Sequence, residues 1–257
     1  MYILALETTG KYGSAAVIRE DGAVFSASSE NEMNHLRDII SISDSAVRQA
    51  GISNSDLTHI AASRGPGSFT GIRIGVTTAR TLAQMLGIPC IAVSSLEAMA
   101  HRVLDAAINA DCLYVVPLIN ARRHQVYAGV WTAAFTSDCE QQTLIAEQEE
   151  RQYMIEELIG ILHDLIRETG GKVFFTGDGI DAYGDIIFSS MEEGSYVLAG
   201  EEIRYQNAED VAAVALSYAK AGRTVEYSEL LPEYMRLSEA EMKLREGSLS
   251  DKISRIK

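Results

Sequence analysis

The sequence is poor in cysteine, in basic residues and in long apolar runs. Its three cysteines, Cys90, Cys112 and Cys139, are odd in number and widely spaced, which excludes a disulfide-rich secreted scaffold and a cysteine-based metal site. We expect them to be reduced, as in the cytoplasm. No apolar run reaches the roughly 18 residues of a membrane span, and the N-terminus has no basic region ahead of an apolar stretch. These absences predict a cytoplasmic protein with no membrane partner.

Positive charge is scarce throughout the chain. The sequence has 22 Lys and Arg against 36 Asp and Glu, which gives a formal net charge of −14. Binding of nucleic acid depends on clustered Lys and Arg that neutralise phosphates. The chain is therefore a poor candidate to hold RNA by itself, and any link to RNA is expected to run through a more basic partner.

Constellations of catalytic residues are also missing. The five histidines show neither an H-x-x-x-H nor an H-E-x-x-H spacing, so no metal site is predicted. Ser68 lies in the turn G-P-G-S-F-T, which lacks the G-x-S-x-G order of a nucleophile elbow and gives a peptidase little support. Arg122, Arg123 and His124 form a small basic cluster between two predicted strands, an arrangement more typical of a solvated loop than of a ligand site.

The most informative segment is residues 63–96. A strand at 58–63 leads into a turn with three glycines, where Gly accepts backbone angles closed to other residues and Pro66 fixes its own φ. Ser68 or Thr70 then caps a helix. A strand, a glycine-rich turn and a capped helix can cradle an anion or allow another backbone to approach closely. Spacing alone does not choose between these uses, and the turn is neither a P-loop nor a G-x-G-x-x-G fingerprint.

The helix that follows, residues 71–86, has a stripe of small side chains at Gly71, Gly75, Ala79 and Ala83. A glycine inside a helix costs roughly 1 kcal/mol relative to alanine, so close packing must offset Gly75. The stripe fits either tight packing inside one domain or a helix–helix contact between subunits.

The run GPGSFTGIRIGVTTARTLA and the following IPCIAVSSLEAMA closely resemble the signature of the TsaB (YeaZ) family. These proteins are accessory subunits of the bacterial machinery that makes threonylcarbamoyladenosine on tRNA. The resemblance extends to ILALETTGKYGSAAV near the N-terminus, to NARRHQVYAG and to PEYMR, so it covers nearly the whole chain. Two positions depart from the family: Glu7 stands where Asp is usual, and Gln125 where Glu is usual. Both departures put a chemical role for these side chains in doubt.

With 257 residues, the chain can form one large domain or two small ones. Three antiparallel strands precede alternating helices and strands, an order that predicts an α/β fold with mixed sheets. The predicted strands are 2–7, 13–19, 23–29, 58–63, 90–93, 113–119, 126–132 and 172–176, and the predicted helices are 33–50, 71–86, 96–107, 153–167 and 211–221.

The resemblance implies two related subdomains of the actin, hexokinase and heat-shock ATPase superfamily type, with mixed sheets flanked by helices. We expect an N-terminal α/β subdomain at 1–108 and a smaller one at 109–236, whose last helix near 208–222 could pack back on the first. Residues 237–257 are expected to form a mobile charged tail.

In that superfamily, the loop after the first strand holds the nucleotide's phosphates, and an acidic residue there positions the metal. Glu7, Thr8, Thr9 and Gly10 occupy this place, although Lys11 and Tyr12 crowd the turn. A hairpin turn at the end of a buried strand is the simpler interpretation. The run Gly177-Asp178-Gly179 is either a second phosphate loop or a plain turn. We expect a vestigial nucleotide site with no catalytic residue, no resident metal and no cofactor bound tightly by the isolated chain. ATP or ADP and Mg are expected only in the partner complex.

The resemblance implies a non-catalytic scaffold that pairs with a TsaD-like catalytic subunit and supports docking of a TsaE-like ATPase. The complex transfers a threonylcarbamoyl group to the adenosine next to the tRNA anticodon. The TsaD family carries a metal-binding histidine pair, which this chain lacks. Two alternatives remain, a stand-alone small-molecule kinase or ATPase of the same superfamily and a peptidase.

The predicted helix 33–50 has one face with Leu36, Ile39, Ile40, Ser43, Val47 and Ala50. Its other side still carries Ile42 and Ala46, more apolar cover than one packed face requires. We expect this helix and helix 71–86 to lie side by side and present their outer faces to TsaD, or to a second copy when the chain is alone. The candidate interface residues are Leu36, Ile39, Ile42, Ala46, Gly65, Pro66, Gly67, Ser68, Phe69, Thr70, Gly71, Gly75 and Ala79.

Overall fold

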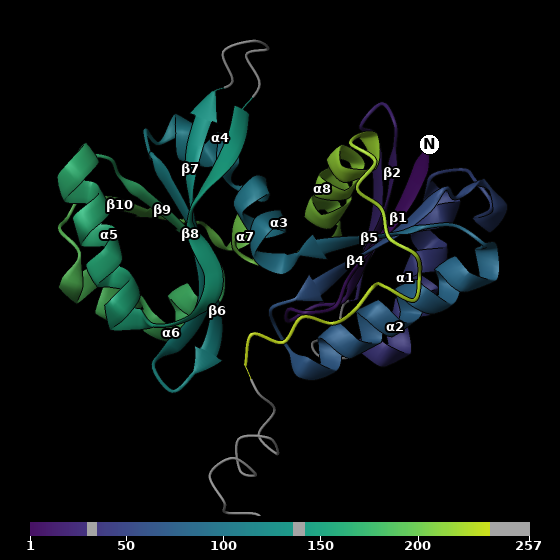
Figure 1. Ribbon diagram of the computed structural model, residues 1–257, viewed down its shortest axis with the longest axis horizontal. Helices are drawn as coiled ribbons and strands as arrows, with labels where there is room; N and C mark the ends of the chain where they lie inside the picture. The colour runs from purple at the N-terminus through teal and green to yellow at the C-terminus, as the bar shows by residue number, and fades with distance from the viewer. Residues whose placement is uncertain (30–34, 136–141, 237–257) are drawn as a thin grey trace, which may run out of the picture.

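The computed structural model describes residues 1–29, 35–135 and 142–236. Figure 1 shows two α/β units side by side, each built around a five-stranded sheet. The first sheet consists of β1 (Tyr2–Glu7), β2 (Ser14–Arg19), β3 (Val24–Ser28), β4 (His59–Gly65) and β5 (Cys90–Ser94). The second consists of β6 (Tyr114–Arg122), β7 (Gln125–Phe135), β8 (Gln142–Met154), β9 (Val173–Thr176) and β10 (Tyr196–Leu198).

The two sheets have the same topology. The first has the strand order β3-β2-β1-β4-β5, and the second has β8-β7-β6-β9-β10 when it is read from the corresponding edge. In each, the first three strands in chain order are antiparallel, and the last two run parallel to the central first strand. The predicted fold class of two related α/β subdomains with mixed sheets is therefore confirmed, although the sequence shows no short internal repeat.

Helices cover both faces of each sheet. On one face of the first sheet lie α1 (His35–Gln49) and α2 (Phe69–Leu86), and on the other lies α8 (Ala208–Lys220). The second sheet is covered on one face by α5 (Ile155–Thr169) and α6 (Gly179–Ser190), and on the other by α3 (Ser95–Arg102) and α4 (Leu104–Asn109). A 3₁₀ turn (Asn54–Asp56) and the short α7 (Glu201–Arg204) complete the order.

The two units exchange helices. Helices α3 and α4 follow the first sheet in the chain but pack under the second, and α8 follows the second sheet but packs on the first. A cut after residue 108 therefore separates the two sheets but not the helices that cover them. Central strands buried on both faces read as near-continuous apolar runs, as ILAL does in β1.

Several predicted elements have different bounds in the structure. The single helix expected at 96–107 is two helices, with Val103 between them in a non-helical conformation. Strand β8 was not predicted because its sequence, QTLIAEQEERQYM, is largely polar. As an edge strand it pairs only with β7 and needs few apolar residues. Helix α6 and strand β10 were also not predicted. The predicted tail, residues 237–257, lies outside the described residues.

The packed face of α1 differs from the predicted one. Ile39, Ile42 and Ala46 are buried in the core of the first subdomain, whereas Ile40 is 59% exposed. Assigning Ile42 and Ala46 to an outer face was therefore wrong, because these side chains pack against the chain's own sheet. The side chain of Leu36 lies outside the described part of the chain.

The small-residue stripe of α2 packs inside the subdomain. A Cβ added at Gly71 or Gly75 would overlap Thr8, which follows β1. Ala79 and Ala83 are buried in the same core. The structure thus supports the interpretation of the stripe as tight packing within one domain. Gly71, Gly75 and Ala79 do not lie on the outer face of α2.

Candidate functional site

Glu7 ends β1, and its carboxyl group is turned into the protein. The backbone N–H of Thr9 donates to Glu7 Oε1 at 2.5 Å, and the Thr9 hydroxyl donates to the same atom at 2.6 Å. The hydroxyl of Ser63, from β4, donates to Oε2. Burial raises the pKa of Glu7, and these hydrogen bonds oppose that shift. Both carboxyl oxygens are therefore engaged inside the first subdomain.

The rest of the loop after β1 ties three elements together. The Thr8 hydroxyl donates to Gly71 O at 2.7 Å, which joins the loop to α2. The Thr9 hydroxyl lies 3.0 Å from that of Ser95, at the start of α3. A Cβ at Gly10 would meet the side chain of Gln206, so Gln206 packs closely against the loop. The loop thus has structural partners at each predicted phosphate-loop position.

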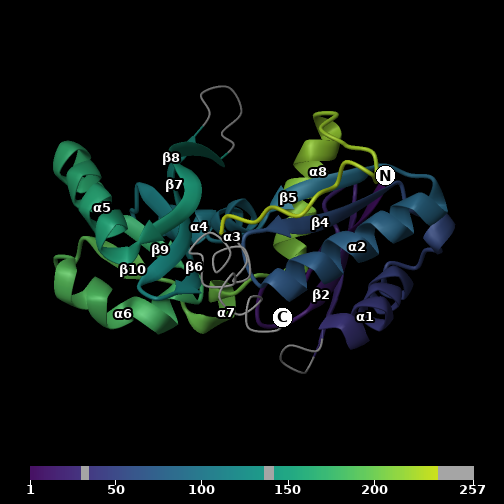
Figure 2. The same cartoon turned by 60° about the horizontal axis from the view of Figure 1, so that its bottom comes forward.

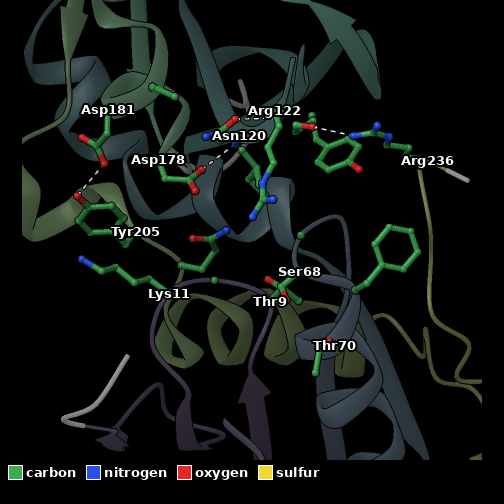
Figure 3. A pocket seen from close by; sticks show the side chains of 18 of the residues that line it. Thr9, Lys11, Ser68, Thr70, Asn120, Arg122, Asp178, Asp181, Tyr205 and Arg236 are labelled. Carbon is green, nitrogen blue, oxygen red and sulfur yellow. Dashed lines mark hydrogen bonds between the residues drawn. The ribbon is translucent and has the colours of Figure 1, made fainter. Parts of the chain in front are cut away.

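A cleft of about 970 Å³ lies between the two subdomains (Figure 3). The first subdomain contributes residues 9–11 after β1 and residues 67–70, which start α2. The second contributes residues 119–123 of the β6–β7 hairpin, Asp178 and Asp181 of the β9–α6 turn, and Tyr205. Of the predicted nucleotide-site residues, Thr9 and Gly10 line this cleft, whereas Glu7 and Thr8 do not.

The Gly-Asp-Gly turn lies at the wall of the cleft in the second subdomain. Gly177, with φ +104°, and Gly179 both approach Leu118 of β6 so closely that a Cβ would collide with it. Between them, Asp178 accepts a hydrogen bond from Asn120 N at 2.8 Å, and burial raises the pKa of this carboxyl. The glycines therefore serve close packing, and the turn places the carboxyl group of Asp178 at the wall of the cleft.

The β6–β7 hairpin brings positive charge into the cleft. Arg122, Arg123 and His124 have positive φ values of 64°, 55° and 60° at its tip. The Arg122 backbone N–H donates to Asn120 Oδ1 at 2.8 Å, and its side chain extends into the cleft between Asn120 and Ser68 (Figure 3). Arg122 and Arg123 both line the cleft. The sequence favoured a solvated loop for these residues. No periodic pattern shows in which direction side chains at a hairpin tip point, so their place in the cleft could not be predicted.

Residues 225–236, here called the C-terminal strap, run from the edge of the first sheet to the second subdomain. Val225 exchanges two backbone hydrogen bonds with Cys90 of β5. The ring of Tyr234 stacks on that of Phe69, with 4.9 Å between the ring centroids. The Tyr234 hydroxyl accepts a hydrogen bond of 2.9 Å from Arg73 Nε. Figure 2 shows the strap passing along β4 and α2.

The strap then reaches the cleft. Arg236 Nη1 donates to Ala121 O at 3.0 Å, and Arg236 is one of the residues that line the cleft. The strap contains the PEYMR run, which contributed to the family resemblance, but Arg236 was not predicted as a site residue. No signal marked Asp181 or Tyr205, which join each other by a hydrogen bond of 2.8 Å across the same wall.

The turn before α2 is enclosed by its own chain. A Cβ at Gly65 would meet Glu233 O of the strap, and one at Gly67 would meet Thr9. Ser68 caps α2 by accepting from Gly71 N at 3.3 Å, so the cap is Ser68 rather than Thr70. Among residues 65–70, only Thr70 is exposed.

The donor set can be tested against a metal-bound nucleotide. Magnesium is usually held by one or two carboxylates together with substrate phosphates. The Glu7 carboxyl is engaged inside the core, and Asp178 is engaged by Asn120. Within residues 1–29, 35–135 and 142–236, no group of three or more His, Cys, Asp or Glu is placed to hold a metal ion. These residues do not fit a magnesium centre built on Glu7.

One face of the first subdomain is formed by α1 and α2 lying side by side (Figures 1 and 2). Ile40 on α1 is 59% exposed and Met85 on α2 is 78% exposed. Helix α2 carries Arg73 and Arg80 and no acidic residue, in a chain of net charge −14. No helix in the described part of the chain is long and apolar enough to cross a membrane.

Comparisons with known proteins give a family model and relatives that are both named for tRNA threonylcarbamoyl modification. Residues 28–244 match the family described as "TsaD: tRNA N6-adenosine threonylcarbamoyltransferase". The chain is 30% identical over 244 residues to the "tRNA threonylcarbamoyladenosine biosynthesis protein TsaB" of Escherichia coli (strain K12), covering 95% of this chain and 98% of that protein. It is 28% identical over 246 residues to the Bacillus subtilis (strain 168) protein of the same name, covering 95% and 97%.

A solved structure supports the fold. The structure named "YeaZ from Pseudomonas aeruginosa" matches with a TM-score of 0.70 and 24% identity, over 91% of this chain and 99% of that chain. At this identity the match concerns the fold, and it includes both subdomains.

Proposed function

Because this chain belongs to the TsaB (YeaZ) family of tRNA threonylcarbamoyladenosine biosynthesis proteins, we propose that it is a non-catalytic subunit that binds and activates a TsaD-like threonylcarbamoyltransferase. In this proposal the partner transfers the threonylcarbamoyl group to adenosine next to the tRNA anticodon, and a TsaE-like ATPase docks on the pair. The tRNA is held through the complex, since a net charge of −14 disfavours direct binding.

The orientation of Glu7 is the observation that carries the non-catalytic role. A residue that positions a metal or moves a proton must present its carboxylate to the substrate. Glu7 instead accepts from Thr9 and Ser63 within the core, and its raised pKa favours the neutral form. The same geometry argues against the alternative of a stand-alone kinase or ATPase. In the proposal, ATP or ADP and Mg bind in the partner complex rather than tightly to this chain.

The outer surface of α1 and α2 is the proposed docking face. It exposes Ile40 and Met85, and the arginines of α2 give it a local positive charge that an acidic surface would complement. The match of residues 28–244 to the TsaD family means that the two subunits are related chains, which can pair through equivalent helices in a pseudo-symmetric four-helix contact. A second copy of this chain covers the face when TsaD is absent.

The substitution Ile40→Glu tests this docking face. It would bury an unpaired charge only if the partner covers α1, so we expect binding to the TsaD-like protein and self-association to weaken by at least about tenfold. The matched control is Phe188→Glu on α6, which alters a side chain of similar exposure, 60%, on the other subdomain. Titration calorimetry and sedimentation measure both associations. Equal weakening by both variants, or by neither, would place the interface elsewhere.

A further inference from the structure

The tip of the β6–β7 hairpin holds two arginines without an acidic partner at the edge of the cleft. Arg122 and Arg123 both line the cleft, and the side chain of Arg122 extends into it toward Ser68 (Figure 3). Across the described residues of the chain, neither guanidinium group makes a hydrogen bond or an ion pair. Acidic residues are in excess in this chain, with a net charge of −14. Two unpaired arginines in one cleft therefore point to an acidic ligand.

The acidic residues of the same cleft are engaged within the chain. Asp178 accepts a hydrogen bond of 2.8 Å from Asn120 N, and burial raises the pKa of its carboxyl group, which favours the uncharged form. Asp181 forms an ion pair of 2.5 Å with Arg204 Nη1 and accepts from the Tyr205 hydroxyl at 2.8 Å. The positive charge of the hairpin tip is thus left available to a ligand.

The backbone of the hairpin fixes the position of Arg122. Asn120 Oδ1 accepts from Arg122 N at 2.8 Å and from the Tyr183 hydroxyl at 3.2 Å. Arg122, Arg123 and His124 all have positive φ, a conformation that is unfavourable for residues with a Cβ. Residues held in such conformations cluster at binding and catalytic sites. The tip keeps arginine at positions where glycine would be less strained, which agrees with a binding role for the side chains.

The opposite wall of the cleft offers uncharged hydrogen-bond donors. Residues 67–70 of the first subdomain line it, and they include the hydroxyl groups of Ser68 and Thr70 at the start of α2. The first turn of α2 has no acidic residue, and the first backbone N–H groups of a helix have no acceptor within that helix. A group placed between Arg122 and this wall can therefore accept hydrogen bonds from both subdomains.

We propose that the cleft binds a diphosphate group without a metal ion, with Arg122 and Arg123 on one side and the start of α2 on the other. Guanidinium groups form charge-assisted, bidentate hydrogen bonds to phosphate oxygens. The two arginines provide one guanidinium group for each of two linked phosphates. Glu7 and Asp178 have partners within the chain and are not required. With about 970 Å³, the cleft admits free pyrophosphate or a larger molecule that carries a diphosphate. The site does not depend on the proposed partner subunit.

Titration calorimetry of the isolated full-length chain with inorganic pyrophosphate, in a magnesium-free buffer of low ionic strength, tests the site. We expect the wild-type protein to bind pyrophosphate, and Arg122→Ala and Arg123→Ala each to bind at least about tenfold more weakly, because a charged hydrogen bond is lost. Arg122→Lys keeps the charge but not the planar fork, so its affinity should lie between those of wild type and Arg122→Ala. The matched control is Arg167→Ala, which removes the same charge from an exposed position on α5 and should bind like wild type.

Adenosine diphosphate, titrated under the same conditions, distinguishes the sources of the diphosphate. Equal affinity for ADP and pyrophosphate would show that the diphosphate group alone is recognised. ADP binding that is at least about tenfold tighter would identify a nucleotide as the ligand. Either result supports the site if the affinity falls in Arg122→Ala.

Three results would overturn the site: no binding of pyrophosphate, binding only when magnesium is added, or equal affinity in wild type, Arg122→Ala and Arg123→Ala. An equal loss in Arg167→Ala would reduce the effect to net charge and would also overturn it. Circular dichroism checks that each variant is folded. Hydrogen exchange then tests both walls, because pyrophosphate should slow exchange of the amides at 69–70 and at 122–123. Protection at 122–123 alone would overturn the contribution of α2.

Discussion

The two subdomains share one strand topology but use their first hairpins differently. In the first subdomain, the turn after β1 directs Glu7 inward, where Thr9 and Ser63 engage its carboxyl group. In the second, the equivalent β6–β7 hairpin directs Arg122 outward into the cleft. Topology places both hairpins at the cleft, and side-chain direction decides which one offers a charged group to a ligand. The acidic residue at the end of β1 is thus part of the core of the first subdomain.

Removing the Glu7 carboxyl group should have the largest effect. In Glu7→Ala, the Thr9 N–H and the Thr9 and Ser63 hydroxyls lose their acceptor, and a cavity remains. Leaving one buried group unsatisfied costs about 1–3 kcal/mol, so we expect at least about 3 kcal/mol of lost stability in urea unfolding. Glu7→Gln retains an acceptor for Thr9 and should keep tRNA modification by the reconstituted complex within about tenfold. A catalytic residue would contribute on the order of a hundredfold or more. A loss of that size with folding and partner binding intact would make Glu7 catalytic.

Gly75→Ala should have the next largest effect, because its Cβ would overlap Thr8 in the turn after β1. Overpacking of this kind costs about 1–3 kcal/mol. The control is Gly160→Ala on α5, where the added Cβ meets nothing within 4 Å and should stabilise the helix by up to about 1 kcal/mol. Chemical denaturation measures both variants. Equal effects would mean that the small-residue stripe of α2 is not packed on the turn.

The smallest effect is expected at the tip of the β6–β7 hairpin. The β2–β3 connection uses Asp21-Gly22, with Gly22 at φ +91°, whereas Arg123 and His124 take positive φ without glycine. Left-handed backbone costs a non-glycine residue about 1–2 kcal/mol, which the entropy of glycine partly offsets. His124→Gly should therefore raise the unfolding free energy by about 1 kcal/mol or less. His124→Ala serves as the control for the loss of the contact between His124 Nδ1 and Glu156 Oε1, which lie 3.3 Å apart, and should not stabilise the protein. A gain in both variants would show that the imidazole, not the backbone, is unfavourable.

Much of the fold could be predicted from local patterns. The strands of the first subdomain, a helix cap at Ser68 or Thr70 and the helices at α1, α2, α5 and α8 follow from periodicity and capping residues. The rotation of α1 could not be fixed, because apolar residues surround most of that helix and only packing shows that Ile42 is inside and Ile40 outside. The return of α8 to the first sheet was among the expectations. The packing of α3 under the second sheet was not, because it depends on long-range contacts, which leave no trace in a local pattern.

The candidate site was harder to predict than the fold. The sequence pointed to the residues directly after β1 as part of a site, and some of them line the cleft. The inward direction of the Glu7 side chain, however, depends on Ser63, which lies 56 positions away in the chain. Arg122 and Asp181 line the cleft because two hairpins and a helix start converge there. Such convergence follows from tertiary structure and has no sequence spacing of its own.

The most direct test of the account is threonylcarbamoyladenosine formation on tRNA, measured with the TsaD-like and TsaE-like proteins of the same organism in the presence and absence of this chain. We expect product only when this chain is present. We expect no product from the isolated chain supplied with ATP, Mg, tRNA and the threonylcarbamoyl donor, and no ATP turnover by that chain. Product formation or ATP turnover by the isolated chain, or full activity of the partners without it, would contradict the role of an activating, non-catalytic subunit.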